Sequence, residues 1–175
     1  AEVLLRWAHP KVGMVPPKDF IPLLEQTGLI IPVGEWVIEQ ACKQWSAWKQ
    51  KGLLAKNALL TLNISTCQFS SQQLLECIST IMTKLDIPNN TLAFEVVEEL
   101  LNSNPNRLSE TFAQLNKMGV DIIVDNFGLG STSLHSLSTY TLSAIKLEKS
   151  LVSSLSKKKD GNSLQAFPSL PHSPA

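Results

Sequence analysis

The chain has 175 residues, 43% of them hydrophobic and 17% charged, and its fifteen basic residues balance its fifteen acidic ones. This length fits one domain, and the composition excludes a disordered or collagen-like chain. The balanced charge predicts no nucleic-acid polymer as a partner, and no apolar run approaches the roughly 20 residues of a membrane-spanning helix. Three cysteines without CxxC spacing argue against a zinc site and a disulfide framework, and indicate a cytoplasmic location.

Apolar segments of strand type and helix type alternate along the chain. The first, residues 2–8, is short and is followed by His9-Pro10, which favours a strand. Helices over residues 17–28 and 34–51 come next, each with a glycine placed to end it. Further strands are predicted over residues 59–64, 92–97, 120–125 and 143–148, and further helices over 71–85, 105–119 and 133–137.

Near-continuous apolar strand interiors predict a mainly parallel sheet covered by helices. A closed parallel barrel usually needs eight strand–helix units in about 250 residues, so five units leave such a barrel unclosed. Either the sheet is open or part of the fold is missing. The chain begins with neither an initiator Met nor a signal peptide, so we expect a piece of a longer protein. Residues 156–175 contain much Lys, Ser and Pro and are expected to be unstructured.

Polar and acidic residues gather where the predicted strands end. The carboxyl ends of parallel strands share one rim, so residues that are distant in sequence can converge there. Divalent cations such as Mg²⁺ or Mn²⁺ would compensate clustered carboxylates, and two such ions can support phosphodiester hydrolysis. A single acidic residue at a strand end is more often a solvated loop residue. The residues at these strand ends are Asn63, Glu95, Glu98, Asp125, Asn126, Lys146 and Glu148.

Ordered motifs give these residues a more specific interpretation. The sequence resembles the EAL domain family of bacterial cyclic-di-GMP phosphodiesterases over about residues 1–160, with residues 161–175 as a Pro- and Ser-rich tail outside the domain. The motifs that carry the resemblance are Glu2-Val-Leu-Leu-Arg-Trp7, Phe20-Ile-Pro-Leu23 with Glu25, Gly28-Leu-Ile30, Asn63-Ile-Ser65 with Gln68-Phe69, Glu95-Val-Val-Glu98, Asp125-Asn-Phe-Gly128 and Ile145-Lys-Leu-Glu148.

The resemblance implies an α/β fold, a TIM-like (β/α)8 barrel of the EAL type that is incomplete here, with about five strands present. Its first strand is expected to run antiparallel to the others. A reversed first strand would bring Glu2, at the start of that strand, to the rim where the other candidates lie.

The resemblance also implies a role for each site residue. Lys146 matches a catalytic lysine that orients the attacking water, and Glu98 matches a glutamate that braces the loop after the fourth strand. Arg6 matches an arginine that contacts the substrate phosphate, a role that suits a guanidinium. The implied cofactor is Mg²⁺ or Mn²⁺ in a two-metal site. The expected metal ligands are Glu2, Asn63, Glu95, Asp125 and Asn126.

Several departures from the family pattern weaken the expected site. Asn126 stands where active members have a second aspartate, so a neutral amide replaces a charged ligand. Leu129 and Ser131 replace a Thr and a Tyr in the loop linked to dimerisation, whereas Glu148 for Asp and Val97 for Thr are milder changes. The family's later metal-binding glutamate has no counterpart before Ala175, which we attribute to a shifted reading frame near Gly161. We therefore expect this chain to be inactive by itself.

Three functions remain open from the sequence. The first is the family's metal-dependent hydrolysis of cyclic di-GMP to linear pGpG. The second is a module without catalysis that binds the nucleotide or another protein, including a second copy or other domains of a longer signalling protein. The third is a fragment without a ligand, whose exposed strand edges make it unstable or dependent on a partner.

Overall fold

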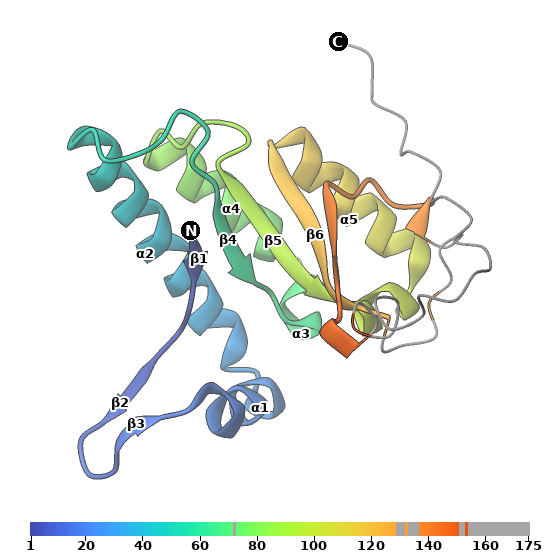
Figure 1. Ribbon diagram of the computed structural model, residues 1–175, viewed down its shortest axis with the longest axis horizontal. Coiled ribbons are helices and arrows are strands. Elements are labelled where there is room, and N and C mark those ends of the chain that lie inside the picture. Colours follow the sequence, from blue (N-terminus) through green and yellow to red (C-terminus); the bar gives the residue numbers. More distant parts are fainter. Residues whose placement is uncertain (72, 129–131, 133–136, 151–152, 154–175) are drawn as a thin grey trace.

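A computed structural model describes residues 1–71, 73–128, 132, 137–150 and 153, and it shows a five-stranded sheet covered on one face by helices, with a separate two-stranded hairpin (Figure 1). The sheet has five strands in the order β1-β4-β5-β6-β7, and each strand pairs with its neighbours in parallel. The strands are β1 (Glu2–Val3), β4 (Leu60–Asn63), β5 (Leu92–Val97), β6 (Val120–Phe127) and β7 (Ala144–Leu147). The predicted mainly parallel sheet is therefore confirmed.

The direction of the first strand corrects the sequence-based expectation. β1 pairs with β4 in parallel, with Glu2 opposite Thr61 and Val3 opposite Leu62, so the expected antiparallel first strand is wrong. Glu2 does not need a reversed strand to reach the rim. β1 ends one residue after Glu2, and Thr61 lies two residues before the end of β4, so the glutamate already lies near the carboxyl end of the sheet.

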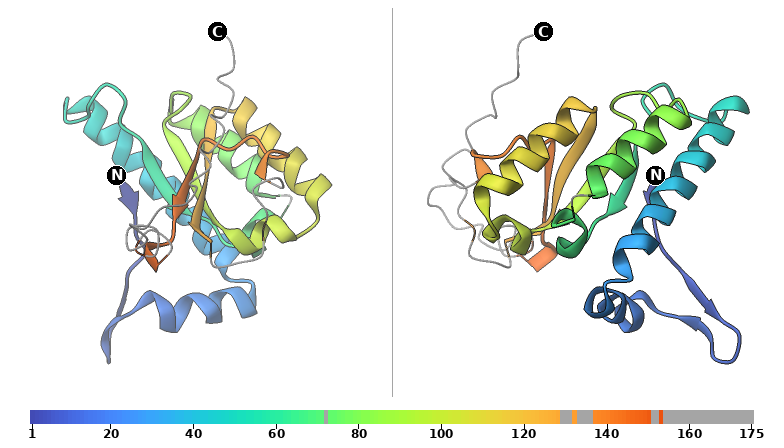
Figure 2. Two further views of the ribbon diagram at one scale, coloured as in Figure 1. Left: turned by 45° about the vertical axis from the view of Figure 1, so that its right-hand side comes forward. Right: turned by 180° about the vertical axis from the view of Figure 1, so that it is seen from behind.

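The helices follow the predicted order. They are α1 (Pro17–Thr27), α2 (Ile30–Gln50), α3 (Thr66–Phe69), α4 (Gln73–Lys84), the 3₁₀ helix η1 (Glu98–Asn102) and α5 (Pro105–Lys117). Figure 2 shows α2, α4 and α5 side by side on one face of the sheet. The short α3 and η1 were not predicted from the sequence. The predicted helix over residues 133–137 and the predicted tail fall mainly or wholly outside the described residues.

The hydrophobic core fills the space between the sheet and these helices. Alternate residues of β5 and β6 point into it, because side chains alternate between the two faces of a strand. Phe94 and Ile122 are fully buried there, beside Ile78 of α4 and Phe112 of α5. In β4, β5 and β6 the odd-numbered residues Asn63, Glu95 and Asp125 lie on the other face, whereas in β1 and β7 the odd-numbered Val3 and Ile145 pack against the core and the even-numbered Glu2 and Lys146 lie on the other face.

The predicted first strand, residues 2–8, divides into two elements. β1 stops at Val3, and Trp7–His9 forms a second strand, β2, which pairs with β3 (Gly13–Val15) in an antiparallel hairpin. The Trp7 ring packs edge-on against Phe20 of α1, with ring centroids 5.7 Å apart. This packing attaches a hairpin that otherwise projects away from the sheet (Figure 1) to α1.

A close contact between α2 and α3 fixes the turn that follows β4. Ser65 and Gln68 form a capping box, in which Gln68 Oε1 accepts from Ser65 N at 3.0 Å. The Gln68 side chain is buried against Gly34, where an added Cβ would lie 1.8 Å from Gln68 Nε2. A glycine at position 34 therefore leaves room for the side chain that caps α3.

None of the described helices is by itself long and apolar enough to cross a membrane. α1 and α2 together meet the length and composition requirement, but they are bent by 120° at the break between them.

Candidate active site at the carboxyl end of the sheet

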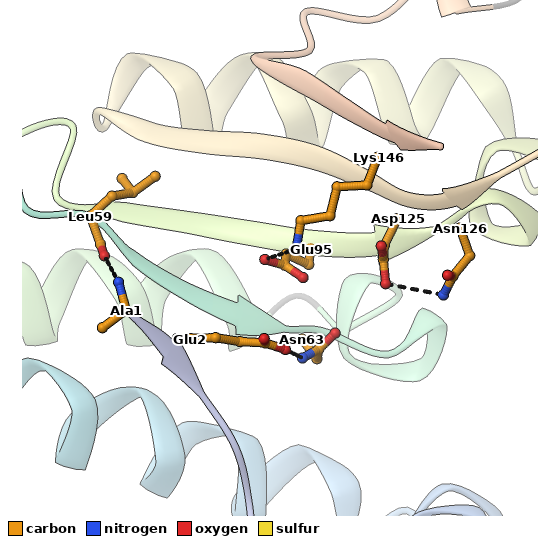
Figure 3. Close-up of polar contacts among 8 residues, drawn as sticks. All are labelled: Ala1, Glu2, Leu59, Asn63, Glu95, Asp125, Asn126 and Lys146. Atoms are coloured by element: carbon orange, nitrogen blue, oxygen red, sulfur yellow. Dashed lines mark hydrogen bonds and ion pairs between the residues drawn. The ribbon is translucent and has the colours of Figure 1, made fainter. Parts of the chain in front are cut away.

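Five neighbouring strands bring candidate site residues onto the face of the sheet that the helices do not cover (Figure 3). Asn63 lies opposite Glu95 in the pairing of β4 with β5, and Asp125 lies opposite Val97 in the pairing of β5 with β6. Glu2 approaches from β1 and Lys146 from β7. These five side chains therefore lie on one face of the sheet, and they converge as the shared rim of parallel strands predicts.

Glu2 and Asn63 form the most exposed contact of the group. Asn63 Nδ2 donates a hydrogen bond to Glu2 Oε1 at 3.2 Å, and both residues are exposed. The amide oxygen of Asn63 is not used in this bond. An amide oxygen and a carboxylate thus lie together on adjacent strands, the kind of pair that a hard cation accepts as ligands.

Glu95 and Lys146 form the central ion pair of the site. Lys146 Nζ lies 2.6 Å from Glu95 Oε1; the Glu95 side chain is 2% exposed and that of Lys146 is 45% exposed. The hydrogen bond to Glu95 raises the pKa of Lys146 above its ordinary value, with further support from the charges of Glu95, Asp125 and Glu2. An ammonium therefore lies among three of the acids expected to hold a metal.

Asp125 and Asn126 lie at an irregularity in β6. Val124 pairs with Ile145 and Phe127 with Leu147, so β6 has one extra residue relative to β7 between these pairs, as in a β-bulge. Asn126 has φ +53°, in the left-handed region, and its Nδ2 donates to Asp125 Oδ2 at 3.1 Å. Asn tolerates this conformation better than most residues. The amide at position 126 therefore acts here as a hydrogen-bond donor to its neighbour.

Glu98 makes a different kind of contact. It is 2% exposed; its Oε2 accepts from Gly128 N at 2.8 Å and its Oε1 accepts from Thr132 N at 3.0 Å. Both donors follow β6 in the chain. Glu98 therefore binds the backbone after β6, and it does not line the cavity described next.

A cavity of about 310 Å³ opens beside the site, between α1, α2 and the ends of β4 and β5. Arg6 lines it together with Asn63, Glu95 and Asp125, and most of its other walls are apolar. Arg6 is exposed, and its Nη1 donates to Leu5 O at 2.9 Å. A cationic group and an apolar wall thus lie next to the acidic rim, which suits a ligand with both a phosphate and a flat apolar part.

The donor types at the rim fit a hard divalent cation, since they are carboxylate and amide oxygens without a Cys or His. Their present arrangement is not that of a loaded site. Within the described ranges, no three residues of the types His, Cys, Asp and Glu lie close enough together to hold one ion. The Lys146 ammonium contacts the most buried of the acids instead.

The model of the EAL domain family matches residues 1–173. The chain belongs to the EAL domain family. The family match confirms the resemblance from which the site residues were predicted. The EAL domain family is metal-dependent. The individual roles of those residues remain predictions, and Leu129 and Ser131 of the expected dimerisation loop lie outside the described residues.

Relatives of the EAL domain include signalling proteins from several bacteria. This chain is 36% identical to the signalling protein YkoW of Bacillus subtilis, over 87% of its length. It is 33% identical, over 91% of its length, to the bifunctional diguanylate cyclase/cyclic di-GMP phosphodiesterase MucR of Pseudomonas aeruginosa. These matches span 19% and 23% of the two relatives. The EAL domain described here is therefore similar to a small part of each.

Solved structures confirm the fold. The phosphodiesterase PaMucR in complex with c-di-GMP superposes with a TM-score of 0.81 at 33% identity, covering 89% of this chain and 62% of that one. The EAL enzyme Bd1971, in its cAMP- and cyclic-di-GMP-bound form, gives a TM-score of 0.79 at 26% identity, covering 90% of this chain and 43% of that one. The EAL-type TIM-like barrel is thus confirmed, in the incomplete form of a five-stranded sheet.

Gln68 belongs to one of the family motifs in the sequence, but no role was predicted for it. In the structure it is 5% exposed, caps α3 and lines the cavity beside Asn63. The spacing of Ser65 and Gln68 is the S-x-x-Q pattern of a capping box, so the sequence contained the signal. The bulge at Asp125 and Asn126 had no comparable signal.

Proposed function

We propose that this EAL domain binds cyclic di-GMP across the carboxyl ends of its strands and takes part in its metal-dependent hydrolysis to linear pGpG. The observation that carries the proposal is the convergence of Glu2, Asn63, Glu95 and Asp125 on one face, beside a cavity lined by Arg6. The relatives whose names or titles mention cyclic di-GMP support the choice of substrate.

Each residue at the rim has a distinct task in this proposal. Glu2, Asn63, Glu95 and Asp125 would hold Mg²⁺ or Mn²⁺, which when bound supplies positive charge to the phosphate and activates water. Arg6 binds phosphate oxygens through its guanidinium and orients the diester. Lys146 keeps its proton on Nζ and positions the attacking water by hydrogen bonding. Hydrolysis adds this water across one P–O bond, which opens the ring and leaves a terminal phosphate.

A second candidate, binding without hydrolysis, is favoured by one specific observation. Asn126 donates a hydrogen bond to Asp125 Oδ2. This bond occupies a carboxylate oxygen of Asp125, and the neutral amide adds no negative charge for a pair of metal ions. The loss of one negative ligand should weaken the second ion most. Cytoplasmic location and assembly with other domains or a second copy stay predictions.

Calorimetric titration with cyclic di-GMP separates these candidates, once without metal and once with Mn²⁺, with chromatography of the products. Formation of pGpG supports hydrolysis, and saturable heat without product supports the binding module. Arg6→Ala should weaken binding about tenfold or more, because it removes a charge-assisted contact to phosphate. Lys11→Ala, an equal loss of charge in the exposed hairpin, is the matched control. The absence of heat and product from the wild type would refute both candidates.

A further inference from the structure

The acids at the rim surround a cation that belongs to the protein itself. Lys146 extends from β7 across β6 to Glu95 on β5, past Asp125 (Figure 3). Charge interactions with Asp125 and Glu2 add to its ion pair with Glu95. The ammonium therefore supplies positive charge at the place where the expected ligands converge.

Glu95 is the acid that most needs this charge. Its side chain is 2% exposed, and among the described residues the Lys146 ammonium is the partner that Oε1 has. A buried carboxylate without a compensating cation is costly. The contact of Oε1 with Lys146 Nζ at 2.6 Å therefore compensates its charge.

A divalent cation on Glu95 cannot simply be added to this arrangement. A metal bound to Oε1 and an ammonium at 2.6 Å from the same oxygen would be two positive charges in contact. One of the two must leave that oxygen. Lys146 is the group able to move, because its side chain is 45% exposed, it lies on the last described strand of the sheet, and its four-carbon stem is flexible.

We propose that Lys146 occupies Glu95 in the metal-free protein as an internal counter-ion, and that a divalent cation must displace it to bind. The idea rests on the proposed function in one respect, since it takes the rim acids as the cation site. It goes further in making Lys146 a competitor that sets the metal affinity of the site. The displaced ammonium is then available to the substrate side of the rim.

Direct Mn²⁺ titration of the metal-free chain, by calorimetry or by the free Mn²⁺ electron paramagnetic resonance signal, tests the competition without measuring activity. Lys146→Met should bind Mn²⁺ more tightly than the wild type, on the order of tenfold to a hundredfold, the equivalent of one charged hydrogen bond. Lys146→Arg keeps the charge and should restore weak binding. Lys149→Met removes an exposed charge three residues away and should leave the affinity within about twofold of the wild type.

A wild-type measurement covers the case in which Lys146→Met does not fold. Acylation of lysines, followed by mass spectrometry, should modify Lys146 several-fold faster when Mn²⁺ is present, because displacement frees the amine. The labelling rate of Lys149 should not change, and the same buffer without Mn²⁺ gives the reference rate.

Several results would overturn the proposal. These are an unchanged or weaker Mn²⁺ affinity in folded Lys146→Met, no binding by either protein, or labelling of Lys146 that does not respond to Mn²⁺. Nucleotide binding without metal is measured separately by calorimetry. The competition can therefore fail while the proposed function stands, and the reverse can also occur.

Discussion

Glu95 and Glu98 are both buried acids near the end of β5, yet different partners compensate their charges. Glu98 accepts hydrogen bonds from two backbone N–H groups, of Gly128 and Thr132, which are fixed parts of the chain. Glu95 contacts the ammonium of Lys146, which ends a flexible and partly exposed side chain. Backbone donors cannot leave without local unfolding, whereas an ammonium can. The difference separates an acid that holds the structure from one that can exchange its partner.

The largest loss of stability is expected when Glu98 is removed. Glu98→Ala would leave the Gly128 and Thr132 N–H groups without their carboxylate, at a cost of about 3 kcal/mol in the free energy of unfolding. Glu98→Gln keeps one acceptor oxygen and should cost about half as much. Urea denaturation followed by circular dichroism measures both variants. A loss below about 0.5 kcal/mol for Glu98→Ala would show that these bonds do not stabilise the fold.

Removal of Lys146 should cost less than removal of Glu98. Lys146→Met leaves Glu95 buried without its cation, but the lysine is 45% exposed, so we expect about 2 kcal/mol instead of the larger loss seen for fully buried pairs. A second substitution, Glu95→Gln, should recover most of this loss because the uncompensated charge disappears. A double-mutant cycle in urea denaturation measures the coupling. Additive effects of the two substitutions would mean that the ion pair contributes nothing.

A third variant changes the donor side of the Glu98 contact. Gly128 has φ +110°, a conformation that favours glycine, and its N–H donates to Glu98 Oε2. Gly128→Ala should therefore cost about 1 kcal/mol through backbone strain, although the carboxylate remains. Gly13→Ala is the control, since Gly13 also has a positive φ, of 78°, but lies in the exposed hairpin. Equal losses in thermal unfolding would confirm that backbone strain accounts for the effect at Gly128, and a clearly larger loss there would show that the substitution also weakens its bond to Glu98.

The sequence predicted the elements of the sheet better than their ends. Near-continuous apolar runs such as Leu92–Val97, which only Glu95 interrupts, identified the central strands, because buried parallel strands have no regular polar alternation. The segment from Glu2 to Ala8 is also mostly apolar, yet it divides into two strands separated by residues 4–6. That division depends on the packing of Trp7 against Phe20, which no local pattern records.

The convergence of the candidate site residues was predicted from the sequence, whereas the contacts between them were not. Motif order identified Glu95, Asp125 and Lys146, and the shared rim of parallel strands placed them together. The ion pair between Glu95 and Lys146 depends on strand order and on the reach of one side chain, neither of which the sequence contains. The antiparallel first strand was inferred from resemblance alone, and the pairing of Glu2 with Thr61 overturns it.

The smallest effect on stability is expected at Asn126, the exposed residue of the β6 irregularity. The same position should have a clear effect on Mn²⁺ affinity. Asn126→Asp replaces the donor to Asp125 Oδ2 with a second carboxylate, and Asn126→Gly removes the side chain while accepting the φ of +53°. Both should change the free energy of unfolding by less than about 0.5 kcal/mol, because the site is exposed.

The Mn²⁺ affinities of Asn126→Asp and Asn126→Gly should differ. Asn126 thus belongs with Glu95, the acid whose partner can exchange, and not with Glu98. Asn126→Asp should bind Mn²⁺ several-fold more tightly than the wild type, since it adds a negative ligand beside Asp125, and the gain should shrink as salt concentration rises. Asn126→Gly should match the wild type. If the glycine variant also bound more tightly, the wild-type amide would act by holding Asp125 Oδ2 away from the cation, and the missing charge would not be the cause.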